Sequence, residues 1–249
     1  SGITNGQRAQ VLVEALPYIQ KYNQKIVVIK YGGNAMINDE LKHDVMRDMV
    51  LLNLIGVKVV LVHGGGPEIS SMLKRVGKQS EFVNGLRVTD EETSEIVQMV
   101  LAGKINKSLV AYLDNLGGRA MGICGMDGGL IKARMMDAQL GYVGEITRVD
   151  PQPILDLLER GYIPVVSTIG CDETGHVYNI NADTAAASIA SSLHAESLIS
   201  MTDTSGLLRD PSNPATLIRR VDLAGVEELK EAGVISGGMI PKVECCTKA

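Results

Sequence analysis

Short apolar runs alternate with longer amphipathic stretches along most of the chain. β-Branched runs at residues 25–30 and 58–62 each lead into glycine, a pattern typical of buried strands that end in tight turns. Further strands are expected near residues 141–149, 163–168, 177–180 and 197–201, and helices near residues 40–54, 66 onward, 89–102, 153–160 and 182–193. The alternation predicts an α/β fold, a three-layer αβα sandwich around a mostly parallel central sheet.

Local capping signals sharpen the helix boundaries. Asn38-Asp39 can cap the helix at 40–54, and Thr89-x-x-Glu92 reads as a capping box for a helix that reaches about Ala102. One more helix, at about residues 8–22, precedes the first strand and carries an apolar stripe. Pro17 falls inside it and is expected to kink it. This helix fits equally well against its own domain or against another subunit.

Composition narrows the class of protein. The 249 residues carry a formal net charge of −5, which argues against nucleic acid or an anionic membrane as the main partner. No apolar run reaches the roughly 18 residues of a membrane span, and residues 1–10 show no signal-peptide pattern. The four cysteines lack C-x-x-C spacing, which disfavours a zinc site or a disulfide framework. We expect a cytoplasmic protein with reduced thiols and no metal held by its own side chains.

Glycine is abundant, with 27 residues, and several glycine clusters directly follow predicted strands. These clusters are Gly32-Gly33, Gly64-Gly65-Gly66, Gly170 and Gly206. Unpaired N–H groups at a strand–glycine–helix turn bind anions, and ligands of open α/β sheets lie at the carboxyl ends of the strands. The pattern favours an anionic ligand. No G-x-x-x-x-G-K-[ST] or G-x-G-x-x-G motif is present, which disfavours a Walker ATPase and a dinucleotide-binding oxidoreductase.

Five motifs occur in a fixed order across nearly the whole chain. They are residues 29–36 (IKYGGNAM), 62–67 (VHGGGP), 84–89 (NGLRVT), 178–183 (YNINAD) and 237–242 (GGMIPK). Together they resemble the amino acid kinase family, and NGLRVT resembles its acetylglutamate branch. The resemblance implies ATP-dependent phosphorylation of the γ-carboxylate of N-acetyl-L-glutamate, giving N-acetyl-L-glutamyl 5-phosphate in the second step of arginine biosynthesis.

The chemistry of the residues agrees with that reaction class. A carboxylate nucleophile, with a reference pKa of about 4.3, is already ionised at pH 7, so no general base is required. The difficulty is bringing one anion onto another. Catalysis should therefore consist of positioning and charge neutralisation by lysines, backbone N–H groups and Mg²⁺.

The resemblance also implies roles for individual residues. Lys30 and Lys242 would stabilise the transferring phosphoryl group from the substrate and nucleotide sides, and Asp183 would orient both lysines. Acetylglutamate would be bound by Gly65, Gly66, Arg87 and Asn179, with Arg87 on the α-carboxylate. Phosphate and ATP would be bound by Gly32, Gly33, Gly64, Thr202, Asp203, Gly206, Gly237 and Gly238.

Simpler interpretations exist for the same residues. Lys30 could be a solvated lysine at a strand end, Asp183 a helix N-cap, and Arg87 half of a surface salt bridge. His63 could merely hydrogen-bond the glycine loop. The Cys245-Cys246 pair is expected to be inert.

The resemblance implies a single domain in which residues 1–24 form an oligomerisation helix. Residues from about 25 to 170 would bind acetylglutamate and dimerise, and residues from about 171 to 249 would bind ATP. A kinked first helix resembles the hexameric branch that L-arginine inhibits, and a PII-type regulatory protein is a further candidate partner. Only seven residues follow Lys242, where family chains usually run some 40 further, so the C-terminus is expected to be incomplete.

Two alternatives stay open. The first is a sister kinase acting on a longer acylated amino acid, such as acetylaminoadipate in lysine biosynthesis. The second is a non-catalytic homologue that binds arginine or a protein partner, which the presence of Lys30, Asp183 and Lys242 argues against.

Overall fold

The fold was analysed in a computed structural model that describes residues 2, 4–36, 38–201, 206–236 and 239–248. Its strands are β1 (Ile26–Tyr31), β2 (Lys58–His63), β3 (Phe82–Val83), β4 (Leu86–Arg87), β5 (Ala120–Cys124), β6 (Ile131–Met135), β7 (Gly144–Val149), β8 (Ile163–Ser167), β9 (Ile169–Cys171), β10 (Val177–Asn179) and β11 (Ser197–Ser200). Its α-helices are α1 (Asn5–Tyr22), α2 (Asp39–Leu54), α3 (Gly66–Arg75), α4 (Glu91–Gln98), α5 (Asn106–Asn115), α6 (Gln152–Glu159), α7 (Ala182–Ser192), α8 (Leu223–Glu231) and α9 (Met239–Lys248).

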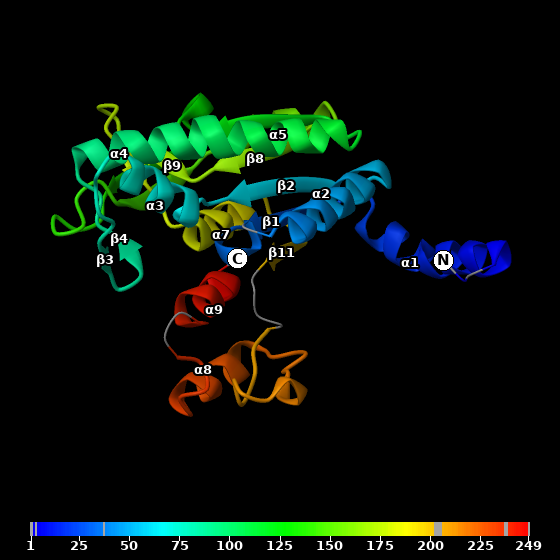
Figure 1. The fold of residues 1–249 in the computed structure, drawn as a ribbon. Coiled ribbons are helices and arrows are strands. Elements are labelled where there is room, and N and C mark those ends of the chain that lie inside the picture. The colour runs from blue at the N-terminus through cyan, green and yellow to red at the C-terminus, as the bar shows by residue number, and fades with distance from the viewer. Residues whose placement is uncertain (1, 3, 37, 202–205, 237–238, 249) are drawn as a thin grey trace.

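The central sheet has the strand order β11-β1-β2-β8-β5, and all its neighbours run parallel. The predicted α/β fold with a parallel central sheet is confirmed (Figure 1). The carboxyl ends of β1 and β2 therefore lie side by side, with Tyr31 in register with His63. The glycine clusters that follow these two strands start from one edge of the sheet.

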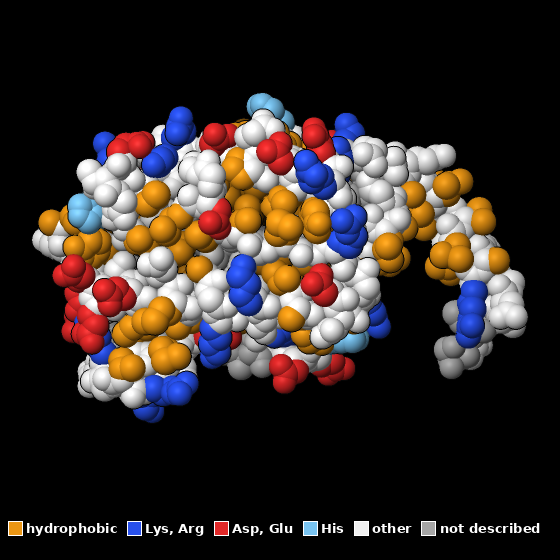
Figure 2. Space-filling model, turned by 90° about the horizontal axis from the view of Figure 1, so that it is seen from above, with side chains coloured by type: hydrophobic (Ala, Val, Ile, Leu, Met, Phe, Trp, Pro, Cys, Tyr) orange, Lys and Arg blue, Asp and Glu red, His pale blue; other side chains and the backbone are white. Residues whose placement is uncertain are grey.

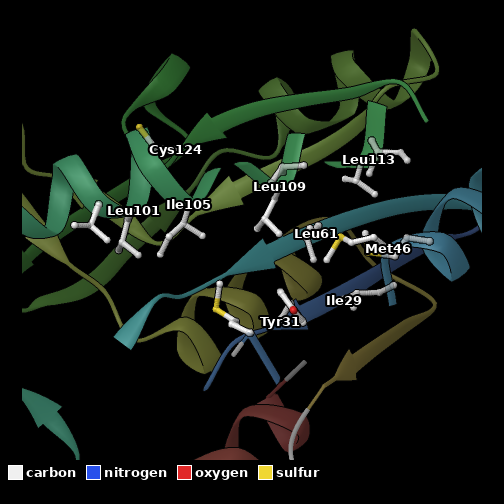
Figure 3. Packing of buried hydrophobic residues seen from close by; sticks show 14 of the residues in the cluster. Ile29, Tyr31, Met46, Leu61, Leu101, Ile105, Leu109, Leu113 and Cys124 are labelled. Atoms are coloured by element: carbon white, nitrogen blue, oxygen red, sulfur yellow. The ribbon is translucent and has the colours of Figure 1, made fainter. Parts of the chain in front are cut away.

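Side chains alternate between the two faces of this sheet, as the pleat requires. Val27 and Ile29 of β1 belong to a core with α2, α3, α4 and α5, whereas Val28 belongs to a second core with α6 and α7. Figure 3 shows Ile29, Leu61 and Met46 meeting Leu109 and Leu113 in the first core. Helices on both faces produce the three layers.

The expected strands near residues 141–149 and 177–180 form, but they do not join the central sheet. They lie in a separate mixed sheet of order β10-β9-β6-β7, in which β9 and β6 are the parallel pair. A single parallel sheet was therefore the wrong placement for these two segments. Apolar alternation identifies a strand but does not identify its partner.

The helix after Thr89 starts and continues differently from the expectation. Asp90 is the N-cap, and its side chain accepts a hydrogen bond from the Thr93 N–H at 2.8 Å. Thr89 is instead fully buried, and its hydroxyl donates to the Arg87 carbonyl at 2.8 Å. Helix α4 continues through a π-helical segment, Met99–Ile105, directly into α5. The capping-box interpretation was wrong because the residue after Thr89 is the better cap.

Helix α1 buries none of its described residues. Figures 1 and 2 show it projecting from the body as an arm that carries apolar side chains. Leu12 and Tyr18 are about seven-tenths exposed, at 71% and 69%, and Pro17 lies inside the helix. An apolar stripe left in solvent disfavours the interpretation that α1 covers its own domain.

A third, smaller core lies in the C-terminal part, around Val226, Leu229 and Ile235. Helix α9 packs against α7 and returns the chain to the central sheet (Figure 1). Among the described residues, no helix combines the length and apolarity that crossing a bilayer requires.

The first core should dominate stability. Leu61 is fully buried in β2, whereas Leu54 at the end of α2 is 72% exposed. Leu61→Ala is expected to lower the free energy of unfolding by about 2–5 kcal/mol because it leaves a cavity, and Leu54→Ala by less than about 0.5 kcal/mol. Urea unfolding followed by far-UV circular dichroism measures both. Equal losses in the two variants would contradict this account of the core.

Candidate active site

A cleft of about 210 Å³ opens at the carboxyl ends of β1 and β2. Its walls come from the loops after these strands, the β3–β4 hairpin, and the segment from β10 into α7. Residues far apart in sequence therefore meet here because parallel strands end at one edge of the sheet. The predicted substrate and phosphoryl-site residues Lys30, Gly32, Gly33, Gly64, Gly65, Gly66, Arg87, Asn179 and Asp183 all line it.

Three charged side chains meet at this cleft. The Lys30 Nζ atom lies 2.9 Å from Asp183 Oδ1, and the Lys242 Nζ atom lies 3.8 Å from Asp183 Oδ2. Lys30 comes from β1, Asp183 from the first turn of α7 and Lys242 from α9. The Lys30 side chain is only 8% exposed, so it is not a solvated lysine. The N-cap of α7 is Asn181, whose side chain accepts from the Asp183 N–H at 3.0 Å, so Asp183 is not the cap.

The glycine loop after β2 brings backbone close to the cleft. The Gly64 N–H already donates to the Tyr31 carbonyl at 3.2 Å, so it holds the loop to β1. A side chain on Gly65 would overlap Ile105 and Leu101 of the π segment. Helix α3 starts at Gly66 and receives no side-chain cap. Its first N–H groups and the positive end of its dipole are therefore placed to meet an anion.

Arg87 is a buried cation with neutral partners. Its guanidinium donates to Ser80 Oγ at 2.6 Å, to Ser70 Oγ at 2.9 Å and to the Gly66 carbonyl at 3.0 Å, and it lies over the Phe82 ring. No carboxylate among the described residues forms an ion pair with it, so the surface salt bridge is wrong. Burial lowers the pKa of the guanidinium, which still stays charged at neutral pH. A buried cation that faces a cleft is suited to a carboxylate ligand.

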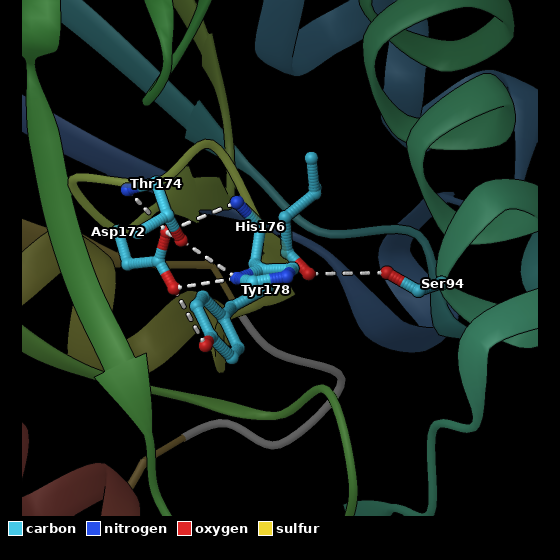
Figure 4. Close-up of polar contacts among 6 residues, drawn as sticks. Ser94, Asp172, Thr174, His176 and Tyr178 are labelled. Carbon is cyan, nitrogen blue, oxygen red and sulfur yellow. Dashed lines mark hydrogen bonds and ion pairs between the residues drawn. The ribbon is translucent and has the colours of Figure 1, made fainter.

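The β9–β10 hairpin, which carries Asn179, is held together by Asp172 (Figure 4). Its carboxylate accepts hydrogen bonds from the N–H groups of Thr174 and His176, from the Thr174 hydroxyl at 2.7 Å, from the Tyr178 hydroxyl at 3.0 Å and from the His176 Nδ1 atom at 3.1 Å. These donors, the Thr174 hydroxyl first, hold the pKa of Asp172 well below its usual range. The sequence analysis missed this cluster, because an aspartate in a turn carries no signal of five donors.

His63 lies behind the glycine loop and is fully buried. Its Nδ1 atom is 2.9 Å from the Gly64 carbonyl oxygen, and its Nε2 atom is 3.2 Å from Asn106 Nδ2. Burial is the main cause that lowers the pKa of His63 to about 4, so the ring is neutral at pH 7. The expectation that His63 hydrogen-bonds the loop is confirmed.

A second cavity, of about 580 Å³, lies next to Lys242 between β11, α8 and α9. It includes the predicted nucleotide-side residue Gly206 and several apolar side chains, among them Leu207, Val226 and Met239. The ion pair of Lys242 with Asp183 connects this cavity to the first cleft. The other predicted nucleotide residues, Thr202, Asp203, Gly237 and Gly238, lie outside the described residues.

This constellation is that of a phosphoryl-transfer enzyme acting on an anionic acceptor. Residues 25–249 match the family model "Amino acid kinase family", and the chain belongs to that family. It is 55% identical over 249 residues to acetylglutamate kinase of Brachyspira hyodysenteriae, and 51% identical over 255 residues to that of Heliobacterium modesticaldum. These alignments cover 99% and 98% of this chain and 86% of each relative.

A solved structure shares the fold at lower identity. The N-acetylglutamate synthase of Neisseria gonorrhoeae, solved with coenzyme A and N-acetyl-glutamate, superposes with a TM-score of 0.80 at 25% identity. The match covers 94% of this chain and 53% of the synthase. The family model and the acetylglutamate kinase relatives indicate that this chain is a kinase.

Because His63 is buried in its neutral form, we expect the free energy of unfolding to fall in acid. The pKa of a histidine is about 6.5 in an unfolded chain, and that of His63 is about 4 in the folded protein. Between pH 6.5 and pH 4 the unfolded chain therefore binds a proton at this residue that the folded protein does not bind. Stability from this group is complete above pH 6.5 and is lost as the pH falls toward 4, by about 2–3 kcal/mol at pH 4.5. Urea unfolding at pH 7.5 and 4.5 measures the loss. His63→Gln should lose less over this range, and identical losses would contradict the prediction.

Proposed function

We propose that this protein transfers the γ-phosphoryl group of ATP to the γ-carboxylate of N-acetyl-L-glutamate, the second step of arginine biosynthesis. The observation that carries the proposal is the bridge of Lys30 and Lys242 by Asp183 at the edge of a glycine-lined cleft. Both lysines are thereby held beside the place where two anions must meet. The acetylglutamate kinase relatives, alignable over nearly the whole chain, support the choice of substrate.

The acceptor would lie in the smaller cleft. Arg87 would bind its α-carboxylate through the N–H groups that Ser70, Ser80 and the Gly66 carbonyl leave free, and Asn179 and the backbone of Gly65 and Gly66 would bind the remaining polar groups. The γ-carboxylate is ionised at neutral pH and attacks the γ-phosphorus directly. The P–O bond to the β-phosphate breaks, and ADP leaves with that oxygen. Lys30 and the N–H groups of Gly33 and Gly65 would neutralise charge on the phosphoryl oxygens.

ATP would occupy the second cavity, placing Lys242 on its phosphates. The cavity is largely apolar, as a base requires, and the buried Ser200 hydroxyl beside it has no hydrogen-bond partner among the described atoms. We assign residues from about 25 to 170 to an acetylglutamate lobe and residues from about 171 to 249 to an ATP lobe, from which Asn179 and Asp183 reach the acceptor cleft.

Mg²⁺ is expected to enter with ATP. The described residues contain no group of three His, Cys, Asp or Glu side chains that could hold a metal ion. The ion would thus be bound mainly by phosphate oxygens and water, where it supplies charge neutralisation. Asp183 is engaged with both lysines and is assigned to orient them.

Coupled ADP release tests the activity and the role of Lys30 together. The wild type is expected to prefer N-acetylglutamate over glutamate and N-acetylaminoadipate in kcat/KM. Lys30→Ala should lower kcat by about 100- to 1000-fold, since it removes a preorganised charge from the transferring group. Lys58 offers a matched control because it lies at the amino end of β2, away from the cleft, and Lys58→Ala should leave kcat unchanged. No activity on N-acetylglutamate would overturn the proposal, and higher kcat/KM on acetylaminoadipate would favour the sister kinase.

We further propose that α1 joins subunits into an assembly larger than a dimer. Its exposed apolar side chains and its projection from the body support this role (Figure 2). Inhibition by L-arginine, the hexameric state and a PII-type regulatory partner are proposed on the family resemblance alone.

Charge placed on the α1 stripe should break that assembly. The double substitution Leu12→Glu and Leu16→Glu replaces two exposed leucines, which are 71% and 48% exposed. We expect the wild type to exceed dimer mass in size-exclusion chromatography with light scattering, and the variant to fall to a dimer, because charged groups resist burial in an interface. Gln20→Glu on the same helix is the control. A wild type of dimer mass would refute the role of α1.

A further inference from the structure

A chain of polar contacts runs from the exposed Lys107 on α5 to the buried back of the glycine loop. Lys107 Nζ donates to Asn106 Oδ1 and to the Gly122 carbonyl, both at 3.0 Å. Asn106 Nδ2 donates to the Val165 carbonyl at 2.9 Å and to the Ile123 carbonyl at 3.3 Å, and it faces His63 Nε2 at 3.2 Å. His63 Nδ1 meets the Gly64 carbonyl at 2.9 Å. His63 and Asn106 are 0% and 1% exposed, so water does not compete for the hydrogen bonds between them and their neighbours.

These contacts determine where the imidazole proton lies. Because Oδ1 of Asn106 accepts from Lys107, its NH₂ group is the part that faces His63. The two N–H bonds of this group are shared among the Val165 carbonyl, the Ile123 carbonyl and His63 Nε2, and the group offers Nε2 no acceptor. In a neutral ring the proton is therefore placed on Nδ1. Nδ1–H donates to the Gly64 carbonyl. The opposite tautomer would set two donors against each other at Asn106 and two acceptors against each other at Gly64.

The Gly64 carbonyl and the Gly65 N–H belong to one peptide group. In a trans peptide these two bonds point in opposite directions across a plane. A carbonyl drawn back toward His63 therefore turns the Gly65 N–H away from the core. Gly65 lines the cleft, and His63 does not. The hydrogen bond from His63 to the Gly64 carbonyl thus directs the Gly65 N–H toward the cleft, on the side away from His63.

Close packing around Gly65 and Gly122 restricts the glycine loop and Asn106 to this arrangement. Gly65 packs so closely on Leu101 and Ile105 of the π segment that any side chain there would collide with them. Gly122 on β5 faces Asn106, and a side chain there would overlap Asn106 Oδ1. The π segment ends at Ile105, immediately before Asn106. One irregular turn therefore both backs the glycine loop and presents Asn106 to His63.

We propose that His63, oriented by Asn106 and Lys107, is a positioning residue that fixes the Gly64–Gly65 peptide so that the Gly65 N–H is directed at the phosphoryl group. The assignment rests on the proposed function for the identity of that group. His63 acts through the peptide and touches neither substrate. Its buried position behind the loop and the ionised acceptor carboxylate leave it no part as a base.

Substitutions that keep or remove the Nδ1 donor test this role. In His63→Asn the side-chain NH₂ stands close to where Nδ1 stood and can still donate to the Gly64 carbonyl. His63→Leu fills similar space without a donor. We expect His63→Leu to lower kcat by about 10- to 100-fold with KM for ATP changed less than about threefold, and His63→Asn to retain kcat within about threefold. Val60→Ala, in the second core, is the control for lost stability without lost kcat.

Two readouts separate this inference from the proposed function. Rates are expressed per folded enzyme, so a purely structural role predicts that His63→Leu keeps the wild-type kcat, and that result overturns the inference. Long-range ¹H–¹⁵N spectra of the wild type should show the Nδ1–H tautomer for His63, and an Nε2–H tautomer also overturns it. A wild type that is inactive on N-acetylglutamate but shows the Nδ1–H tautomer contradicts the proposed function and leaves the orientation of the peptide confirmed.

Discussion

The carboxylate of Asp183 holds two ammonium groups that would otherwise repel each other. Lys30 comes from the first strand and Lys242 from the last described helix, and Asp183 lies between them at 2.9 and 3.8 Å. A phosphoryl-transfer site needs both cations close together before its anionic substrates arrive, and a bridging anion makes that arrangement stable. The same bridge connects the glycine-lined cleft to the larger cavity, so the proposed placement of the two substrates relative to each other depends on it.

Around the Asp183 bridge, we assign different roles to charged side chains and to backbone N–H groups. In the proposed reaction the lysines and Arg87 supply charge and the glycine loop supplies backbone donors, of which Gly65 lies too close to its neighbours for a side chain. Gly65 shows one reason why glycine is needed, because Leu101 and Ile105 occupy the space of a side chain. At this position the glycine in the sequence therefore reflects the approach of the π segment from behind.

Sequence reasoning recovered the parallel sheet and most of the residues that meet at the cleft. Lys30, Arg87 and Asp183 were assigned from the resemblance of their motifs to the family, and the structure places all three at the cleft. Sequence reasoning missed the separate mixed sheet, because hydrophobic alternation does not name the partner of a strand. It also missed the five donors around Asp172 and the relay behind His63, because side chains such as Asn106 and Thr174 acquire their partners only when the fold brings distant carbonyls and turns together.

The π segment Met99–Ile105 has a consequence for how this enzyme tolerates change. A π turn holds one residue more than an α turn, so it accommodates an extra residue without changing the direction that the following helix faces. Deleting one residue from α5 itself would instead rotate the residues beyond the deletion by about 100°. Asn106 and Leu109 must therefore keep their spacing to reach His63 and the first core, whereas the π segment is the part of this helix where a one-residue change in length would turn α5 least.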